Sequence, residues 1–419
     1  MKNSKNFYIN GQWVEPQQQN FLEVINPATE KSIGQISLGS RKDVDLAVGA
    51  ATLAFKSYSQ SSVSERVSIL ENVKRGLESR REEIAKTITE QMGAPITFAR
   101  EAQTFTCIAH VEAMIGILRS FVFEERVGTT LVTKEPVGVV GLITPWNWPL
   151  NQIICKVIPA IAAGCTVVLK PSEIAPLDAI IFAEILHDAG LPAGVFNLVN
   201  GDGPNVGDAI SRHPGIHLVS FTGSTRAGIL VAQAAADTVK RVTQELGGKS
   251  ANIILDDANI AEAVATGVEL CLSNSGQSCD APTHMFVPHR YYEDALNVAA
   301  LTANAAVVGD PLNEKTQYGP LASKMQFDKV QALICSGIEE GARLVAGGVG
   351  RPQGLSTGFY ARPTIFADVK PEMSIVREEI FGPVLIISAY EDEAMAIAYA
   401  NSSHYGLAAY VQSGSLERA

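Results

Sequence analysis

The sequence has few of the features that mark membrane, secreted or nucleic-acid-binding proteins. Its 419 residues include no run of 18 or more apolar residues, which excludes an ordinary membrane-spanning helix. Residues 1–6 lead into no apolar segment, so we expect no signal peptide and a cytoplasmic location. The net charge is −11 and no basic block occurs, which argues against nucleic acid or an anionic membrane as a partner.

Cysteine is also scarce, and its spacing excludes two further classes of protein. The six cysteines form no C-x-x-C pair: Cys107, Cys155, Cys165, Cys271, Cys279 and Cys335. This pattern fits neither a zinc site nor a disulfide framework, and it agrees with a reducing compartment. We therefore expect no bound metal. No internal repeat or low-complexity segment is present.

The chain is long enough for more than one domain, with 46% hydrophobic residues to fill the cores. Residues 7–14 predict a β-hairpin, and the first 120 residues then predict charged amphipathic helices that form an outer layer. From Pro136 to residue 245, buried apolar strands alternate with helices, as in a parallel doubly wound sheet. The pattern restarts after residue 246 and indicates a second α/β domain, with a looser Gly- and Pro-containing region before a strand at 383–389.

Cys279 stands in a loop of small residues, 273–284, between a predicted helix at 260–272 and a predicted strand at 283–287. Small neighbours would leave the sulfur accessible. Most cysteines are nevertheless buried structural thiols, so this loop alone favours a structural role over a nucleophile. A nucleophile would need surroundings that stabilise the thiolate, since a free thiol has a pKa of about 8.5.

Three predicted strand ends carry polar groups, and open α/β sheets bind ligands at such ends. Asn147 lies among two prolines and two tryptophans in residues 143–149; it is either a turn residue or a rigid oxyanion donor. Lys170 and Glu173 form either a solvated ion pair or a clamp on ribose hydroxyls, in which the carboxylate would favour NAD over NADP. Residues 221–228 open a helix that could bind phosphate, although they lack the G-x-G-x-x-G fingerprint.

Two further carboxylates precede glycines. Glu245 is followed by Leu246 and two glycines where the first domain gives way to the second, so it is a candidate general base or an ordinary strand-end residue. The run Arg-Glu-Glu-Ile-Phe-Gly-Pro at 377–383 is either a second ribose clamp or only a loop.

Taken together, these motifs resemble the NAD(P)-dependent aldehyde dehydrogenase superfamily over essentially the whole chain. The residues that carry the resemblance are Pro145-Trp-Asn147, Lys170-Pro-Ser-Glu173, Phe221-Thr-Gly-Ser224-Thr, Glu245-Leu-Gly-Gly, Gly276-Gln-Ser-Cys279 and Glu379-Ile-Phe381-Gly-Pro. The resemblance implies a Rossmann-like NAD-binding domain (1–123 and 137–245), part of an oligomerisation arm (124–136) and a catalytic domain (246–419). A homo-oligomer and a small aldehyde substrate would follow.

By this resemblance, Cys279 would be the nucleophile, Glu245 the general base and Asn147 an oxyanion donor. The cofactor, NAD or NADP, would be held by Trp146, Lys170, Ser172, Glu173, Gly223, Ser224, Glu379 and Phe381. Residues near the substrate would be Trp148, Asn151, Gln152, Cys155, Ser278 and Asp280. The implied reaction is oxidation of an aldehyde to an acid through a thiohemiacetal and a thioester on Cys279.

The resemblance also implies that the chain is a C-terminally short member or a fragment, because family members usually continue for a few dozen residues past Ala419. The alternative function is therefore a truncated remnant that binds NAD without catalysis. A cysteine hydrolase is a third hypothesis, but no Cys–His signature supports it and it would leave two ribose clamps unexplained.

Overall fold

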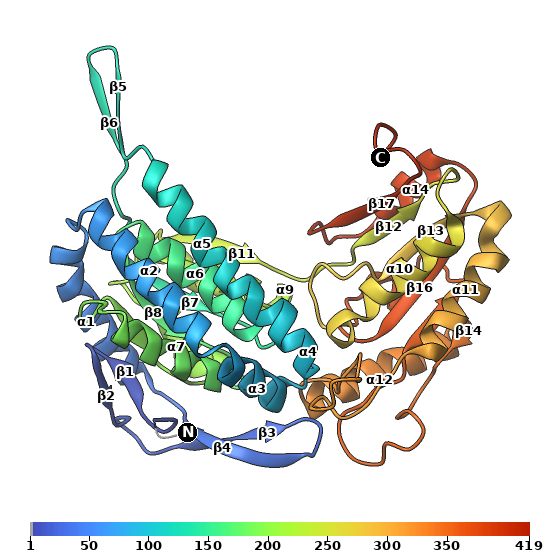
Figure 1. Cartoon of the computed structure of the whole chain (residues 1–419), viewed down its shortest axis with the longest axis horizontal. Helices are drawn as coiled ribbons and strands as arrows, with labels where there is room; N and C mark the ends of the chain where they lie inside the picture. The colour runs from blue at the N-terminus through green and yellow to red at the C-terminus, as the bar shows by residue number, and fades with distance from the viewer. Residues whose placement is uncertain (1–2) are drawn as a thin grey trace. The chain divides into compact units, whose positions relative to one another are not determined.

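The computed structural model describes residues 3–419, which fold as two compact units. Unit 1 holds the chain up to Asn26, Ser32–Gln91 and Thr97–Glu245. Unit 2 holds Pro27–Lys31, Met92–Ile96 and Leu246–Ala419. Each unit is built around its own β-sheet (Figure 1).

The sheet of unit 1 has seven strands in the order β11-β10-β7-β8-β9-β1-β2. Its strands are β1 (Phe7–Ile9), β2 (Gln12–Val14), β7 (Val139–Ile143), β8 (Thr166–Lys170), β9 (Phe196–Leu198), β10 (Leu218–Thr222) and β11 (Arg241–Glu245). The five strands β7 to β11 are parallel, while β1 and β2 add an antiparallel edge. In chain order the parallel strands run 3-2-1-4-5, which is a doubly wound Rossmann-like arrangement and confirms that prediction. The order reverses between β7 and β10, so a ligand crevice is expected at their carboxyl ends.

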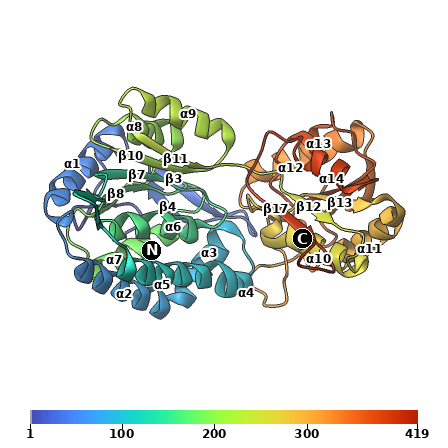
Figure 2. The ribbon, with the colours of Figure 1, turned by 90° about the horizontal axis from the view of Figure 1, so that it is seen from above.

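Helices cover both faces of this sheet (Figure 2). One face carries α1 (Arg41–Tyr58), α8 (Asp208–Arg212) and α9 (Thr225–Ala236), and the other carries α6 (Pro149–Ala162) and α7 (Leu177–Asp188). Outside α6 lie α2 (Val63–Ser79) and α5 (Thr104–Ser120). Four further helical elements lie wholly or mostly in this unit: α3 (Arg81–Met92), α4 (Ile96–Phe98) and the π-helical turns η1 (Ala99–Gln103) and η2 (Gly203–Gly207). The same holds for the strand pairs β3 (Phe21–Asn26) with β4 (Lys31–Ser37) and β5 (Glu124–Val127) with β6 (Thr130–Thr133).

The central strands of unit 1 are apolar along their whole length because helices bury both of their faces. Every residue of β7 and β8 is buried. Apolar residues in α6 recur at helical spacing against them, at Leu150, Ile153, Ile154, Val157, Ile158 and Ile161. This core fixes the strand ends at which the polar candidates lie.

The sheet of unit 2 has six strands in the order β14-β15-β16-β13-β12-β17. They are β12 (Ala251–Ile254), β13 (His284–Pro288), β14 (Arg343–Ala346), β15 (Thr364–Ala367), β16 (Val384–Tyr390) and β17 (Ala409–Gln412), all parallel except β14. The helices α10 (Ile260–Leu272) and α11 (Tyr292–Ala305) cover one face, and α14 (Glu393–Ala400) covers the other (Figure 2). Short 3-10 turns, η3 (Ser273–Gly276) and η4 (His289–Tyr291), precede β13 and α11.

The looser region expected before residue 383 contains regular structure, so that prediction is wrong in part. It holds α12 (Lys324–Glu339), β14, β15 and α13 (Ser374–Arg377). Ser323 caps α12 by accepting a hydrogen bond from Gln326 N, and the helix buries Val330, Leu333 and Ile334. The many glycines and prolines that flank these elements mask their periodicity in the sequence.

The amphipathic helices expected in the first 120 residues are interrupted at one point by the π-helical turn η1, which lies between α4 and α5. The segments 27–31 and 92–96 pack with unit 2, where Phe359 N donates to Pro27 O and Ile96 N donates to Pro311 O. Within residues 3–419, no helix has both the length and the apolar character needed to cross a lipid bilayer.

Candidate active site

Cys279 follows three consecutive residues with left-handed backbone conformations. Asn274, Ser275 and Gly276 have φ values of 53°, 57° and 72°. These residues end α10 at Leu272, as the sequence predicts. A run of left-handed residues that includes two with side chains is costly, and such strain gathers at functional sites.

Hydrogen bonds hold this strained loop in one conformation. The side chain of Gln277 donates through Nε2 to Asn274 O at 3.1 Å and accepts through Oε1 from Ala322 N at 2.9 Å. Ser275 Oγ donates to Gly319 O at 2.8 Å. All these side chains are buried, so the bonds form away from competing water. The loop thus presents Cys279 on a fixed backbone.

Two neighbouring loops of unit 2 press against the Cys279 loop at glycines. A Cβ atom on Gly248 would overlap the carbonyl oxygen of Cys279, and one on Gly276 would overlap the carbonyl oxygen of Gly382. The close approaches therefore join the motifs around 248, 279 and 382, which are far apart in sequence. Glycine is required at both points because any side chain would push the loops apart.

The Cys279 thiol is only partly accessible and lies in an anionic setting. It is the one cysteine of intermediate burial; the others are either buried or exposed. Burial, followed by the charge of Asp280 and a smaller effect of Glu379, raises the pKa of Cys279 to about 11. From the sequence, a nucleophilic Cys279 would need surroundings that stabilise its thiolate, and the described residues of unit 2 do not supply them. A base is therefore needed to remove the thiol proton.

Glu379 is brought to the glycine motif that follows Glu245. Its carboxylate accepts from Gly248 N at 3.1 Å, and its own N–H donates to the Tyr405 hydroxyl at 3.4 Å. Burial raises the pKa of Glu379. Phe381 has a left-handed backbone, with φ at 59°, so this loop also stores strain beside a candidate residue.

Lys249 is a residue of this assembly that the sequence analysis did not single out. Its ammonium donates to Ile375 O at 2.6 Å and to Glu378 O at 3.1 Å, which ties the two loops together. Burial lowers the pKa of Lys249 to about 8. The feature of the sequence that could have indicated this residue is a lysine directly after two glycines.

The first cofactor motif in unit 1 forms an ion pair at the end of β8. Lys170 is buried, and its Nζ donates to Glu173 Oε2 at 3.0 Å and to Pro171 O at 3.0 Å. Ser172 Oγ accepts from Ile174 N at 3.3 Å, which shapes the turn. The pair is half-shielded, since a third of the Glu173 side chain is exposed. The carboxylate can therefore still accept hydrogen bonds from a ligand.

The second motif places a helix N-terminus beside Glu245. Ser224 caps α9 by accepting a hydrogen bond from Ala227 N at 3.3 Å. Gly223 N donates to Glu245 O at 3.0 Å, and Thr222 pairs with Glu245 across the sheet. The Glu245 side chain is exposed at the end of the edge strand β11. Glu245 and the Ser224 turn are thus neighbours at the same edge of the sheet.

Asn147 is buried in the turn between β7 and α6. Gln103 Nε2, from the π-helical turn η1, donates to Asn147 O at 3.3 Å. Trp146 beside it is half-buried, and Trp148 contacts Phe98 edge-to-face with ring centroids 5.3 Å apart. The turn is therefore held by side chains from outside the motif, which the sequence pattern could not reveal.

Lys156 is a second residue that the sequence analysis missed. Its Nζ donates to Ser220 Oγ at 2.8 Å. Burial lowers the pKa of Lys156 to about 8, against an opposing effect of Glu245. The feature of the sequence that could have indicated Lys156 is its place inside an otherwise apolar helix.

Buried polar groups line the carboxyl ends of the strands in unit 1 and lack partners. Thr144 and Thr222, which follow β7 and end β10, have buried hydroxyl groups without a hydrogen-bond partner among residues 3–419. The same holds for both polar atoms of the Asn200 side chain, after β9. Such groups are costly unless a ligand or water completes their hydrogen bonds. Thr144 and Thr222 lie at the reversal between β7 and β10, a position that fits a polar dinucleotide.

The candidate residues therefore fall into two sets. Unit 1 carries Asn147, Glu245 and the residues Trp146, Lys170, Ser172, Glu173, Gly223 and Ser224; unit 2 carries Cys279, Glu379 and Phe381. In the part of the chain that the structure describes, no group of three or more His, Cys, Asp or Glu side chains is arranged to hold a metal ion.

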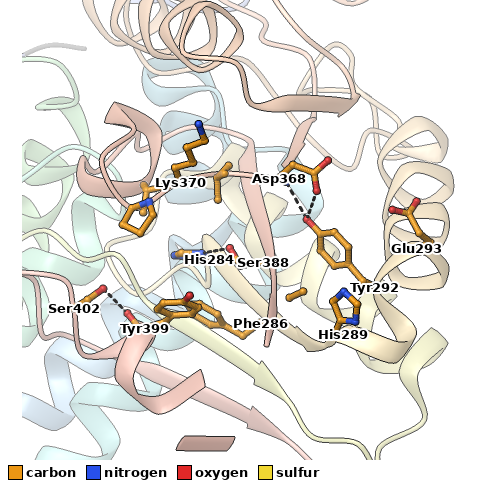
Figure 3. Close-up of a pocket in the computed structure, with 14 residues that line it drawn as sticks. His284, Phe286, His289, Tyr292, Glu293, Asp368, Lys370, Ser388, Tyr399 and Ser402 are labelled. Carbon is orange, nitrogen blue, oxygen red and sulfur yellow. Dashed lines mark hydrogen bonds between the residues drawn. The ribbon is translucent and has the colours of Figure 1, made fainter. Parts of the chain in front are cut away.

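A pocket on the sheet of unit 2 includes none of these candidates (Figure 3). His284, Phe286 and Tyr399 line it, and His284 Nε2 and Ser388 Oγ are 2.9 Å apart. Burial lowers the pKa of His284 to about 3, so this ring is neutral and serves the packing of the sheet.

Comparison with known proteins decides the family. The model of the aldehyde dehydrogenase family matches residues 13–419. The 3-succinoylsemialdehyde-pyridine dehydrogenase of a Pseudomonas species is 57% identical over 420 residues, which cover 100% of this chain and 88% of that protein. The chain belongs to the aldehyde dehydrogenase family.

Solved structures of family members agree with this assignment. Aldehyde dehydrogenase C from Pseudomonas syringae, in complex with NAD+ and octanal, is 52% identical and superposes with a TM-score of 0.99, covering 100% of this chain and 86% of that chain. The NAD+ complex of aldehyde dehydrogenase from Bacillus cereus is 36% identical, with a TM-score of 0.96 and coverage of 99% and 85%. The predictions of the aldehyde dehydrogenase family, the fold class and an enzyme of this kind are confirmed, and the prediction of NAD agrees with these complexes.

Proposed function

We propose that the protein oxidises an aldehyde to a carboxylic acid with NAD+, using Cys279 as the nucleophile. The observation that carries the proposal is the strained, hydrogen-bonded loop that holds this half-accessible thiol within a chain of this family. A structural cysteine would need neither the strain nor the accessibility.

In the first step, Cys279 Sγ bonds to the aldehyde carbon and the carbonyl electron pair moves to oxygen. The side-chain amide of Asn147 and the Cys279 backbone N–H donate to that oxyanion; one such donor contributes roughly 3 kcal/mol to the transition state. The thiol proton must leave first, since the pKa of Cys279 lies well above neutral. Glu245 accepts that proton in the proposed mechanism.

Loss of hydride from the thiohemiacetal leaves a thioester on Cys279. NAD+, when bound, supplies the acceptor for that hydride. Glu245 then takes a proton from water, whose oxygen attacks the thioester carbon, and the C–S bond breaks to release the acid. A carboxylate base suits both proton transfers because its exposed position lets it exchange protons with solvent.

The residues of unit 1 fit the cofactor. Lys170 and Glu173 would hold the adenosine ribose, while Gly223, Ser224 and the N-terminus of α9 would bind the pyrophosphate. Ser172 and Trp146 would complete this side of the site. The Glu173 carboxylate would repel a 2′-phosphate, so NAD is preferred to NADP.

Unit 2 would hold the other end of the cofactor through Glu379 and Phe381. We accordingly propose that residues 1–123 and 137–245 bind NAD and that residues 246–419 carry the catalytic nucleophile. The exposed strand pair β5–β6 lies within the segment 124–136, which we propose as part of an oligomerisation arm of a homo-oligomer.

NADH formation tests the proposal. Purified protein is mixed with NAD+ and an aldehyde panel that includes octanal and 3-succinoylsemialdehyde-pyridine, the compounds in the names of two relatives. We expect turnover that Cys279→Ala abolishes and that Cys335→Ala, at an exposed cysteine of the same unit, leaves unchanged. NAD+ binding without turnover of any aldehyde would contradict the proposal.

A further inference from the structure

The residue directly after the nucleophile is a carboxylate, Asp280. It lies in the same turn as Cys279 and is exposed, and its charge is the strongest charge that acts on the thiol. The charge of Glu379 also raises the pKa of the thiol, by less than that of Asp280. The two charges with the largest effect on the Cys279 thiol are thus both negative.

Tyr410, in strand β17, contacts the side chain of Asp280. The Tyr410 hydroxyl donates to Asp280 Oδ2 over a long 3.5 Å contact. Tyr410 is fixed in β17, where it pairs with Asn252 of β12. The hydroxyl stays protonated near neutral pH because burial, then the charge of Asp280, raises the pKa of Tyr410. Tyr410 therefore orients the carboxylate without neutralising its charge.

The buried lysine of the adjoining loop, Lys249, is directed to backbone oxygens and not to Asp280. Its ammonium donates to the carbonyl oxygens of Ile375 and Glu378. A second negative charge brought to Cys279 would meet repulsion from Asp280.

We infer that Asp280 is a specificity-determining residue: it disfavours aldehydes that carry a carboxylate and leaves neutral or cationic aldehydes as the substrate class. The inference rests on the proposed function, in which the substrate carbonyl must reach Cys279. Repulsion between like charges close to one another supplies selectivity without any contact that recognises the preferred substrate.

A pair of alkylating reagents measures this field without catalysis. Iodoacetamide is neutral and iodoacetate is anionic, yet both attack the same thiolate. A change in the thiol's ionisation alters both rates equally and cancels in their ratio. Peptide mass spectrometry follows the Cys279 peptide separately from the exposed Cys155 and Cys335. We expect Asp280→Asn to lower the iodoacetamide-to-iodoacetate rate ratio at Cys279 about tenfold.

The matched control is Asp294→Asn, which removes the same charge from an exposed position in the first turn of α11. It should leave the ratio unchanged. Salt provides a measurement on the unaltered protein: between about 0.01 M and 1 M the Debye length falls from about 30 Å to about 3 Å, so the ratio should fall. An equal ratio in the wild type and Asp280→Asn, or a ratio indifferent to salt, overturns the inference.

Turnover then tests the substrate class. Butanal and succinic semialdehyde have the same four-carbon chain and differ at the far end, where one carries a carboxylate. Asp280→Asn should raise kcat/KM for succinic semialdehyde relative to butanal by about tenfold. An unchanged preference despite an altered alkylation ratio refutes the role in specificity. Absence of turnover with every aldehyde refutes the proposed function, and the alkylation ratio distinguishes that failure from an error about the charge.

Discussion

Gly248 and Gly276 determine the position of Cys279 because they lack a Cβ atom. Gly248 lies against the carbonyl oxygen of the nucleophile itself, and Gly276 lies against the loop that carries Phe381. Positioning of this kind matters because a displacement of about 1 Å at a reacting group can reduce the rate about a hundredfold.

Replacing Gly248 with alanine should therefore impair catalysis more than stability. The added methyl group would displace the Cys279 backbone, so we expect kcat to fall about a hundredfold. Gly406→Ala is the control, because a Cβ at that position meets no atom within 4 Å. Steady-state kinetics and thermal unfolding measure both effects; wild-type kcat in Gly248→Ala would contradict the positioning role.

At the level of helices and strands, the local signals in the sequence are reliable where periodicity is uninterrupted. The capping box at α2 is an example: Glu65 N donates to Ser62 Oγ at 3.2 Å, and Ser62 N donates to the Glu65 carboxylate at 2.7 Å. The box satisfies backbone donors at the start of a helix that lies outside α6. It therefore acts on stability and not on the site.

Loss of this cap should destabilise the protein without changing catalysis. Ser62→Ala is expected to lower the free energy of unfolding by about 1 kcal/mol. Ser68→Ala, at an exposed position within the same helix, should cost nothing because alanine is the better helix former. Chemical denaturation gives both values. Equal stability of the two variants would show that the cap contributes little.

Some features of the site can be predicted from the sequence, and others depend on tertiary packing. Asn147 and Lys170 could be placed at strand ends because their strands are continuous apolar runs between clear helices. The helix α12 could not, since glycines and prolines flank it. Contacts between distant segments were also invisible: the Gln103 bond to Asn147 and the Tyr410 contact with Asp280 depend on tertiary packing.

At the scale of the whole molecule, unfolding depends on pH through buried ionisable groups. Asp178, in the first turn of α7, is fully buried; Gln91 Nε2 donates to its Oδ1 at 2.6 Å, and its Oδ2 has no partner among residues 3–419. Burial raises the pKa of Asp178 from 3.8 to about 7. The native state thus keeps a proton that the unfolded state releases between these values.

The sign of the effect follows from that difference. The stabilising contribution of protonated Asp178 is complete below about pH 4 and is lost as the pH rises to about 7. Asp178→Asn cannot ionise, so its stability relative to the wild type should increase from pH 4 to 7, by at most about 4 kcal/mol, and then stay level. Thermal unfolding across this range measures it.

The exposed Asp188, at the other end of α7, gives the matched control. Asp188→Asn measures how much of any pH dependence comes from removing an exposed carboxylate from the same helix. A pH-independent difference between Asp178→Asn and the wild type would mean that Asp178 is ionised in the native state, contrary to this description of unit 1.

Capture of the acyl-enzyme tests the central claim most directly. In Glu245→Gln the attack on the aldehyde proceeds slowly but the thioester is not hydrolysed, so mixing this variant with NAD+ and octanal should leave an octanoyl group on protein. Peptide mass spectrometry locates it. We predict acylation of Cys279 alone, with none in the wild type after turnover and none in Cys279→Ala. In Glu245→Gln, an octanoyl group on another residue, or NADH formation from octanal without an octanoyl group on Cys279, would contradict this role of Cys279.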